Sequence, residues 1–448
     1  MNKAIDLRVG FVPLARTTFD IPLASELTIQ ARSALTGGGL ALVGPESLVT
    51  SLQEAKAAAE GLAEQALDLL LVFQATFADS TMLLTLAEAV DAPLLIWAVP
   101  EARSGGRLRL NSFCGINLGA HALARHGHRY DYLYAPPADA QALERVRLLA
   151  QAGRAYRLLR GARIGRVGEN PVGLDTCQLD REALASRFDL EVVQIDLEET
   201  FEKVRAAASQ EVGSAYQDLK TRLDGLDEVD QSALRRTLGT YLALGKTAKQ
   251  QGLAGLAVRC WPEFFTDLGC AACGAMSLLS DEGTPCSCEA DVNGTITQLV
   301  LQWISGEPAF GTDIVSFDLE EDTIVVWHCG LAPLAMADPE VRPRATIHSN
   351  RKLPLLMEFP LKPGRITVAR LSEATGDYRL VVGSGEMLRA PMSFSGTSGV
   401  LRFDRPADQV LDIMLSEGLE HHVSLTYGDH GPTLLALAEM LKLPVLHL

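Results

Sequence analysis

Carboxylates and thiols occur together in the segment CSCEADVNG, residues 286–294, which follows an apolar stretch and precedes a helical pattern. Glu289 and Asp291 are two positions apart, so they point to the same side if the chain stays extended as far as Asp291. Glu263 follows the apolar run LAGLAVRC, at an equivalent strand end. Acids at neighbouring strand ends would converge on a divalent cation such as Mn²⁺ or Mg²⁺. The alternative is an Asp helix cap with solvated loop acids.

Cysteines near this segment allow a second interpretation, a structural zinc site. Cys270-x-x-Cys273 followed by Cys286-x-Cys288 resembles a four-thiolate ligand set. The second pair is spaced too closely for the usual C-x-x-C turn, and the small apolar neighbours in GCAACGA suit cysteine as a compact core residue. The sequence therefore favours packing cysteines over zinc.

Histidines add nitrogen donors to the carboxylate hypothesis. His421 and His422 are adjacent in the extended segment EHHVSLTYGDH, where only one of the two can face the interior. His328 ends an apolar strand in VVWHCG. One such histidine is typical of a core or turn residue, but three of them with the strand-end acids favour a metal site.

The elements that must position these residues predict an α/β fold. Apolar runs alternate with helical patterns through the first two thirds of the chain, which indicates parallel sheets covered on both faces. We expect an N-terminal Rossmann-like domain at residues 1–160. The strand-like run ARIGRVG then begins a second series of strands and helices, which predicts a central α/β domain at 161–312 that carries the carboxylates. Period-2 segments between Gly/Pro turns then predict an antiparallel, β-barrel-like C-terminal domain at 313–448.

Composition limits the function classes. A formal charge of −16 argues against a nucleic-acid partner and against an anionic membrane surface. No apolar run approaches the roughly 20 residues of a membrane helix. The first residues lack the apolar core and cleavage site of a signal peptide, and the eight cysteines suit reduced thiols, so we expect a cytoplasmic protein.

A family resemblance rests on four central and C-terminal motifs. RCWPEFF, CEADVNG, WHCG and EHHV together resemble the L-fucose isomerase / L-arabinose isomerase superfamily, especially its shorter bacterial L-fucose isomerase-like branch. VGFVPLARTTFD, FQATFADST and NSFCGINLG are similar to the N-terminal domain of that branch. The resemblance implies two Rossmann-like domains and a barrel-like C-terminal domain. It also implies aldose–ketose isomerisation of an open-chain monosaccharide through a cis-enediol, with bound Mn²⁺ or another divalent cation such as Mg²⁺ or Co²⁺.

The resemblance also implies roles for individual residues. Glu263 and Asp291 would be metal ligands and acid–base groups, and His422, in preference to His421, would complete the ligand set. His328 resembles a ligand of the arabinose branch only. Glu289 would lie beside the metal without necessarily touching it.

Further candidates are polar residues in loops that follow strands, where open α/β sheets bind ligands. Arg16 would suit an anionic sugar such as a sulfonated hexose, and the alternative is that Arg16 pairs with an acid of the protein. In these isomerases the N-terminal domain tends to cover a neighbouring subunit's site, so we expect a homo-oligomer with its active site near a subunit interface. The candidate substrate-binding residues are Arg16, Gln74, Thr76, Asn111, Asn117 and Trp261.

Two other functions remain open from the sequence. Two α/β lobes also describe non-catalytic sugar-binding or regulatory modules, which need no carboxylate–histidine cluster. A metal-dependent sugar epimerase or lyase would share the enediol step and differ in its product.

Overall fold

The computed structural model describes residues 6–448, so the first five residues, which contributed to the expectation about a signal peptide, lie outside the description. The chain divides into two compact units, one ending at Arg157 and the other beginning at Leu158. The boundary falls within the long helix α5, Ala140–Leu159. No helix of residues 6–448 has the length and apolar character that a membrane span requires.

The first unit contains a five-stranded parallel sheet in the order β2-β1-β3-β4-β5. Strands β1 and β3 are buried along almost their whole length, as expected for a sheet covered on both faces. The strands are Leu7–Leu14, Leu40–Val43, Leu69–Gln74, Leu94–Ala98 and Asp131–Tyr134, and helices α1 to α4 are Ile21–Gly37, Leu52–Ala63, Ser80–Ala89 and Ser112–Arg125.

The second unit begins with a four-stranded parallel sheet in the order β7-β6-β8-β9. Its strands β6 to β9 are Arg163–Val167, Glu191–Ile195, Gly255–Val258 and Cys286–Ser287. Helices α6 to α11 are Arg181–Phe188, Leu197–Arg205, Ser209–Lys220, Gln231–Gln251, Cys273–Asp281 and Val292–Ser305. The short helical turns η1 to η4 are Asp175–Cys177, Leu226–Glu228, Phe264–Leu268 and Cys288–Ala290.

A second sheet follows in the same unit, in the order β12-β13-β16-β11-β10-β17-β14-β15-β18. An additional antiparallel pairing of β15 with β16 closes the strands between them into a barrel. Strands β10 to β18 are Phe310–Asp318, Thr323–His328, Arg344–Thr346, Leu356–Pro360, Gly364–Ser372, Arg379–Leu388, Thr397–Phe403, His422–Tyr427 and Val445–His447. The turn η5 is Leu334–Met336, and helices α12 and α13 are Ala407–Ser416 and Gly431–Leu441. The predicted fold class, parallel α/β followed by an antiparallel barrel, is confirmed.

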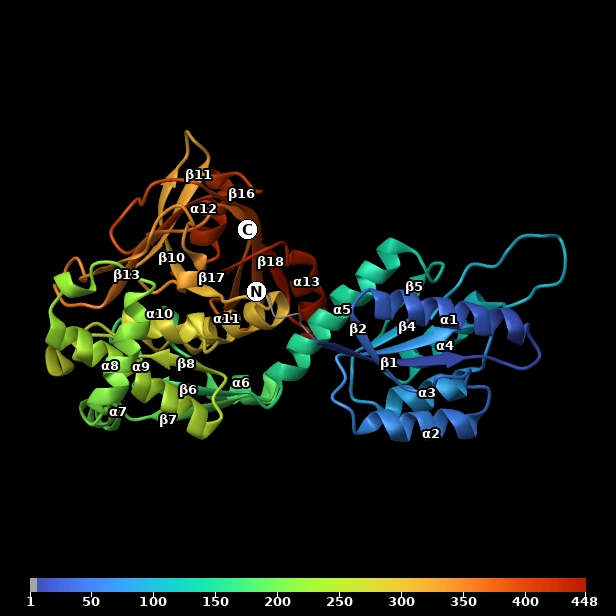
Figure 1. Ribbon diagram of the computed structural model, residues 1–448. Coiled ribbons are helices and arrows are strands. Elements are labelled where there is room, and N and C mark those ends of the chain that lie inside the picture. The colour runs from blue at the N-terminus through green and yellow to red at the C-terminus, as the bar shows by residue number, and fades with distance from the viewer. Residues whose placement is uncertain (1–5) are drawn as a thin grey trace. The chain divides into compact units, whose positions relative to one another are not determined.

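Helix α11 joins the parallel sheet to the barrel and positions the candidate site. It lies between the strands around β8 and those of the barrel (Figure 1), and every residue from Val292 to Leu301 is buried. A helix buried all round serves as core for both of its neighbours. Its hydroxyls also connect the layers: Thr295 Oγ1 lies 3.2 Å from the Leu256 carbonyl of β8, and Thr297 Oγ1 accepts from Leu371 N of β14 at 2.9 Å.

Candidate active site

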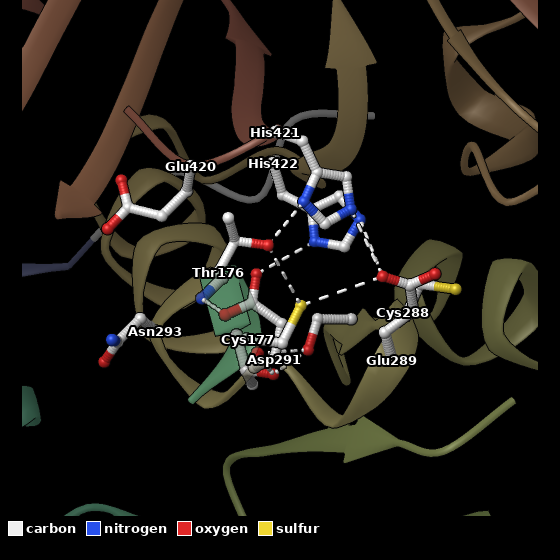
Figure 2. A network of polar contacts seen from close by, with 12 residues as sticks. Thr176, Cys177, Cys288, Glu289, Asp291, Asn293, Glu420, His421 and His422 are labelled. Atoms are coloured by element: carbon white, nitrogen blue, oxygen red, sulfur yellow. Dashed lines mark hydrogen bonds and ion pairs between the residues drawn. The ribbon is translucent and has the colours of Figure 1, made fainter. Parts of the chain in front are cut away.

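Three segments distant in sequence meet at the start of α11. The turn η1 brings Thr176 and Cys177, the turn η4 brings Glu289, and His421 lies beside them just before His422, the first residue of β17 (Figure 2). Ligand atoms of Cys177, Glu289, His421 and His422 all lie within 4.8 Å of one another. Among residues 6–448, this is the group with the donor types and spacing to hold a metal ion.

Glu289 reaches this cluster through a left-handed turn of the backbone. Its φ is 59° and that of Ala290 is 56°, conformations that L-residues rarely adopt. The condition for Glu289 and Asp291 to point to the same side, an extended chain as far as Asp291, is therefore not met: β9 ends at Ser287, and a helical turn follows before α11 begins. The two carboxylates nevertheless approach the same imidazole, that of His422, from different sides.

The Glu289 carboxylate has three different neighbours. Oε1 accepts from Trp261 Nε1 at 2.9 Å, while Oε2 lies 3.2 Å from His421 Nε2 and 3.7 Å from Cys177 Sγ. Burial alone would raise the pKa of Glu289, but the hydrogen bonds from His421 and Trp261 outweigh it and hold that pKa below its usual value. Glu289 is therefore an anion at neutral pH, which suits a cation ligand.

His421 is held from both sides of its ring. Nδ1 lies 2.6 Å from Thr176 Oγ1, and Nε2 faces Glu289. The hydrogen bond with Glu289 raises the pKa of His421 despite partial burial. His421 and His422 have ring centroids 4.0 Å apart. Both histidines therefore border the cluster, whereas the strand pattern predicted that only one would face the interior.

His422 is oriented by a buried carboxylate. Nδ1 lies 3.0 Å from Asp291 Oδ2, so this nitrogen carries the proton and Nε2 remains available as a ligand. Nε2 points toward Glu289 Oε2 at 3.9 Å and Asp313 Oδ1 at 3.4 Å. A carboxylate on one ring nitrogen with a metal on the other is a common arrangement for metal-binding histidine.

Asp291 is fully buried and paired with an arginine. Arg370 of β14 donates through Nη1 to Oδ2 at 2.5 Å and through Nη2 to Oδ1 at 3.2 Å, while Gly294 N donates to Oδ1 at 2.9 Å. Burial opposes its ionisation, but the charge of Arg370 and the His422 hydrogen bond hold the pKa of Asp291 well below its usual range. Its oxygens already have donors and a balancing charge, and Asp291 caps α11 and contacts His422. Its assignment as metal ligand and acid–base group stays a prediction.

Asn293 and Gly294 are the second and third residues of α11 and lie inside its first turn. A Cβ on Gly294 would meet Asp291 Oδ2 at 2.5 Å and Arg370 Nη1 at 3.2 Å. Glycine at 294 therefore permits the close approach of the ion pair to the helix start.

Asp313 is a site residue that the sequence analysis missed. It lies opposite His422 on the neighbouring strand, where β10 pairs with β17. Its Oδ1 is buried without a hydrogen-bond donor among the described residues. A buried carboxylate oxygen without a donor, facing an unprotonated ring nitrogen, indicates room for a cation or a proton between them. The sequence signal was weak, because a single Asp in GTDIVSF is also typical of a solvent-facing strand position.

Glu263 lies apart from this group. Its carboxylate forms a two-fold contact with Arg259, Oε1 to Nη2 at 2.7 Å and Oε2 to Nε at 2.8 Å, and this hydrogen bonding lowers the pKa of Glu263. Glu263 does not belong to the residues whose ligand atoms lie within 4.8 Å of one another. Its assignment as metal ligand and acid–base group stays a prediction.

His328 borders the cluster from β11. Its ring centroid is 6.1 Å from that of His422, and its Nδ1 accepts from Cys329 N at 2.8 Å. His328 is thus a neighbour of the site whose role as ligand stays a prediction.

The thiols of the proposed zinc set do not converge. Cys288 Sγ lies 2.7 Å from Cys260 Sγ, whereas Cys273 Sγ lies 3.3 Å from Cys329 Sγ, and all eight cysteines are free. Cys286 is turned toward the Thr284 carbonyl. Cys177 does lie in the cluster, but burial raises the pKa of its thiol, so it is a protonated and weak donor.

In the first unit, several predicted substrate-binding residues follow the strands β1, β3 and β4. Thr76 Oγ1 accepts from Arg16 N at 2.9 Å, the Arg16 guanidinium is ion-paired with Asp79, and Gln74 is buried and donates to the Ala78 carbonyl. Asn111 precedes α4 with a φ of 53°, and Asn117 is exposed on that helix. Trp261, the candidate in the second unit, contacts Glu289 directly.

Comparison with known proteins identifies the class. Residues 10–160 match the family described as fucose/sulfoquinovose isomerase, N-terminal domain, and residues 358–448 match L-fucose isomerase, C-terminal domain. The chain belongs to the L-fucose isomerase-like family, and it is a carbohydrate isomerase.

Relatives extend over the whole chain. A sulfoquinovose isomerase of Priestia aryabhattai is 32% identical over 97% of this chain and 98% of its own length. Proteins with the same name from Alkalicoccus urumqiensis and Clostridium sp. (strain MSTE9) are each 29% identical, over 99% and 98% of this chain and of their own lengths.

Proposed function

We propose that this protein is a metal-dependent aldose–ketose isomerase that acts on a hexose sulfonated at C6, sulfoquinovose, and yields the corresponding 2-ketose. The observation that carries the proposal is the cluster of Glu289, His421 and His422, which joins a hard oxygen donor to two imidazoles. Full-length similarity to proteins named sulfoquinovose isomerase supports the substrate class.

The donor set fits a divalent cation such as Mn²⁺, Mg²⁺ or Co²⁺. Glu289, His421 and His422 would hold it, with the donor-free oxygen of Asp313 beside them. Bound there, the cation would polarise the adjacent C1 and C2 oxygens of the open-chain sugar. The family resemblance instead implies Glu263, Asp291 and His422. The Arg370 contact argues against Asp291, because a guanidinium at the same oxygens would repel a cation.

The residues of the chain would move two protons. In the aldose, the proton on C2 and that of the C2 hydroxyl must leave, while C1 and its oxygen each gain one. Glu289 offers a carboxylate base for the proton on C2, and Asp313, whose buried oxygen has no donor among the described residues, offers a further acceptor. Thr176 and Asp291 would fix the two imidazoles from behind.

The first unit would complete the site in the assembled protein. Arg16, Gln74, Thr76, Asn111 and Asn117 carry the groups that hydrogen-bond sugar hydroxyls. We place this contribution in a homo-oligomer, in which one subunit supplies the loops over its neighbour's cation.

The test is conversion of sulfoquinovose. Protein is stripped with EDTA, reloaded with Mn²⁺ and incubated with the sugar in D₂O, and the products are identified by NMR. The proposal expects metal-dependent formation of the 2-ketose, with deuterium entering at C1. An aldose epimer as product would favour the epimerase alternative. Tight binding without conversion would favour a sugar-binding module.

A further inference from the structure

Arg351 is a cation without a carboxylate partner close to the candidate site. Its guanidinium carbon lies 4.9 Å from the ring centroid of Trp261 and 5.0 Å from that of Phe265. Within residues 6–448 no carboxylate forms an ion pair with it, whereas Arg259 and Arg370 are each paired with an acid. Aromatic faces hold a guanidinium in place without neutralising its charge. Arg351 is exposed and therefore accessible to an anion.

His348 adds a second hydrogen-bond donor at the same point. Its Nδ1 accepts from Asn350 N at 3.2 Å and Arg351 N at 3.3 Å, so the proton of the neutral ring resides on Nε2. Nε2 lies 3.1 Å from Arg351 Nη1, so two N–H donors face each other. The residue His348 is 6% exposed, and its ring packs edge-on against Phe265. Two adjacent donors at the edge of a buried imidazole require an acceptor.

The protein offers these donors one shared acceptor. The Cys329 sulfur interacts with His348, but the same sulfur also interacts with Cys273 and with His328 Nδ1. An anion with several oxygens would satisfy both donors together, because guanidinium and imidazole N–H groups bind oxyanions with charge-assisted hydrogen bonds.

Trp261 connects this pair to the cation cluster. The edge of its indole donates to Glu289 Oε1 at 2.9 Å, while its face carries the Arg351 guanidinium. One ring therefore separates the acidic cluster from the donors Arg351 and His348. A six-carbon sugar whose C1 and C2 oxygens lie at Glu289 would extend its far end along the indole.

We propose that Arg351 and His348, supported by Trp261 and Phe265, bind the sulfonate group of the substrate. This inference rests on the proposed function and adds the residues that select an anionic sugar. A sulfonate keeps its negative charge and three acceptor oxygens at physiological pH, which matches the two donors. Arg16 suits this task less well, because its charge is already balanced by Asp79.

The experiment compares two sugars that differ only in the sulfonate group on C6, sulfoquinovose and its unsulfonated analogue quinovose. Arg351→Met should lower kcat/KM for sulfoquinovose by about 10- to 100-fold, since a hydrogen bond to a charged group contributes roughly 1.5–3 kcal/mol. The loss should appear mainly in KM, and the kinetics with quinovose should change by less than about two-fold. Arg351→Lys should recover part of the loss, because it restores charge without the planar guanidinium.

Lys352→Met is the matched control, because it removes an exposed positive charge one position away and should leave the sugar preference unchanged. An equal loss with both sugars in Arg351→Met, or no loss, would overturn the sulfonate assignment while leaving the isomerase proposal intact. If wild-type protein converts neither sugar, the proposed function fails. Calorimetric titration of sulfoquinovose into wild-type and Arg351→Met protein then tests sulfonate binding by Arg351 independently of catalysis. Equal affinity of the two proteins for the sugar would overturn the sulfonate assignment.

Discussion

Two neighbouring strand ends, the loop at residues 259–265 after β8 and the segment 286–294 around β9, carry acids that the sequence presents as equivalent. In the first, Glu263 pairs with Arg259 four positions earlier, and both side chains remain partly exposed, at 26% and 18%. In the second, Asp291 is fully buried and pairs with Arg370, which comes from the distant barrel strand β14. Arg259 balances the charge of Glu263 from within the same loop, so this pair needs no other part of the fold. Arg370 balances the charge of Asp291 from the barrel, so this pair ties the barrel to the start of α11 within the core.

The largest effect should come from breaking the buried pair. Arg370→Met would leave Asp291 as an uncompensated charge in the core, and such changes cost about 3–5 kcal/mol. We expect the free energy of unfolding, measured by urea denaturation, to fall by that amount. A loss below about 1 kcal/mol would show that the two pairs are energetically alike.

Glu289→Gln tests which acid holds the cation. Removing the anionic donor from the two histidines should reduce kcat by about 100- to 1,000-fold, as loss of a charge-stabilising group does in other active sites. Mn²⁺ affinity, measured by calorimetric titration, should fall with it. Glu263→Gln is the matched variant, and the cluster geometry predicts a much smaller change in Mn²⁺ affinity. The opposite ranking would restore the ligand set implied by the family resemblance.

Asp313→Asn asks whether β10 contributes a third carboxylate. Its oxygen faces His422 Nε2 without a donor, so neutralising it should lower kcat/KM by about 10- to 100-fold, the range found for residues that support metal ligands. Stability should change little. Asp318→Asn, at the exposed end of the same strand, is the control. Equal activities of the two variants would exclude Asp313 from the site.

The smallest effect is expected for Arg259→Met. The Arg259–Glu263 pair is partly exposed, and such pairs contribute about 0–1 kcal/mol. Thermal unfolding should therefore shift only slightly. A destabilisation as large as that of Arg370→Met would mean that Glu263 is held as rigidly as Asp291, and would weaken the contrast between the two strand ends.

The fold was accessible from the sequence because its signals are local. Buried strands such as LDLLLVF alternate with helical patterns, and the period-2 segments after residue 312 gave the barrel. Glu289, His421 and His422 were among the candidates from the sequence, because acids at strand ends and adjacent histidines are uncommon, although Glu263 and Asp291 were the preferred acids.

The arrangement within the site was not accessible. The left-handed conformations of Glu289 and Ala290 fall on residues that seldom adopt them, so the sequence gives no local sign of the turn. The partners Arg370 and Asp313 come from barrel strands, whose register depends on long-range pairing. A lone arginine in the apolar run ITVARL does indicate a buried cation that needs an acid, and it is the one signal that would have located the partner of Asp291.

Gly294, which has no side chain, serves both the start of helix α11 and the buried ion pair of Asp291 with Arg370. Any side chain there would intrude between the Asp291 carboxylate and the Arg370 guanidinium, so helix initiation and charge neutralisation in this core depend on one and the same small residue. As long as Asp291 caps α11 and pairs with Arg370, position 294 therefore has room for glycine alone.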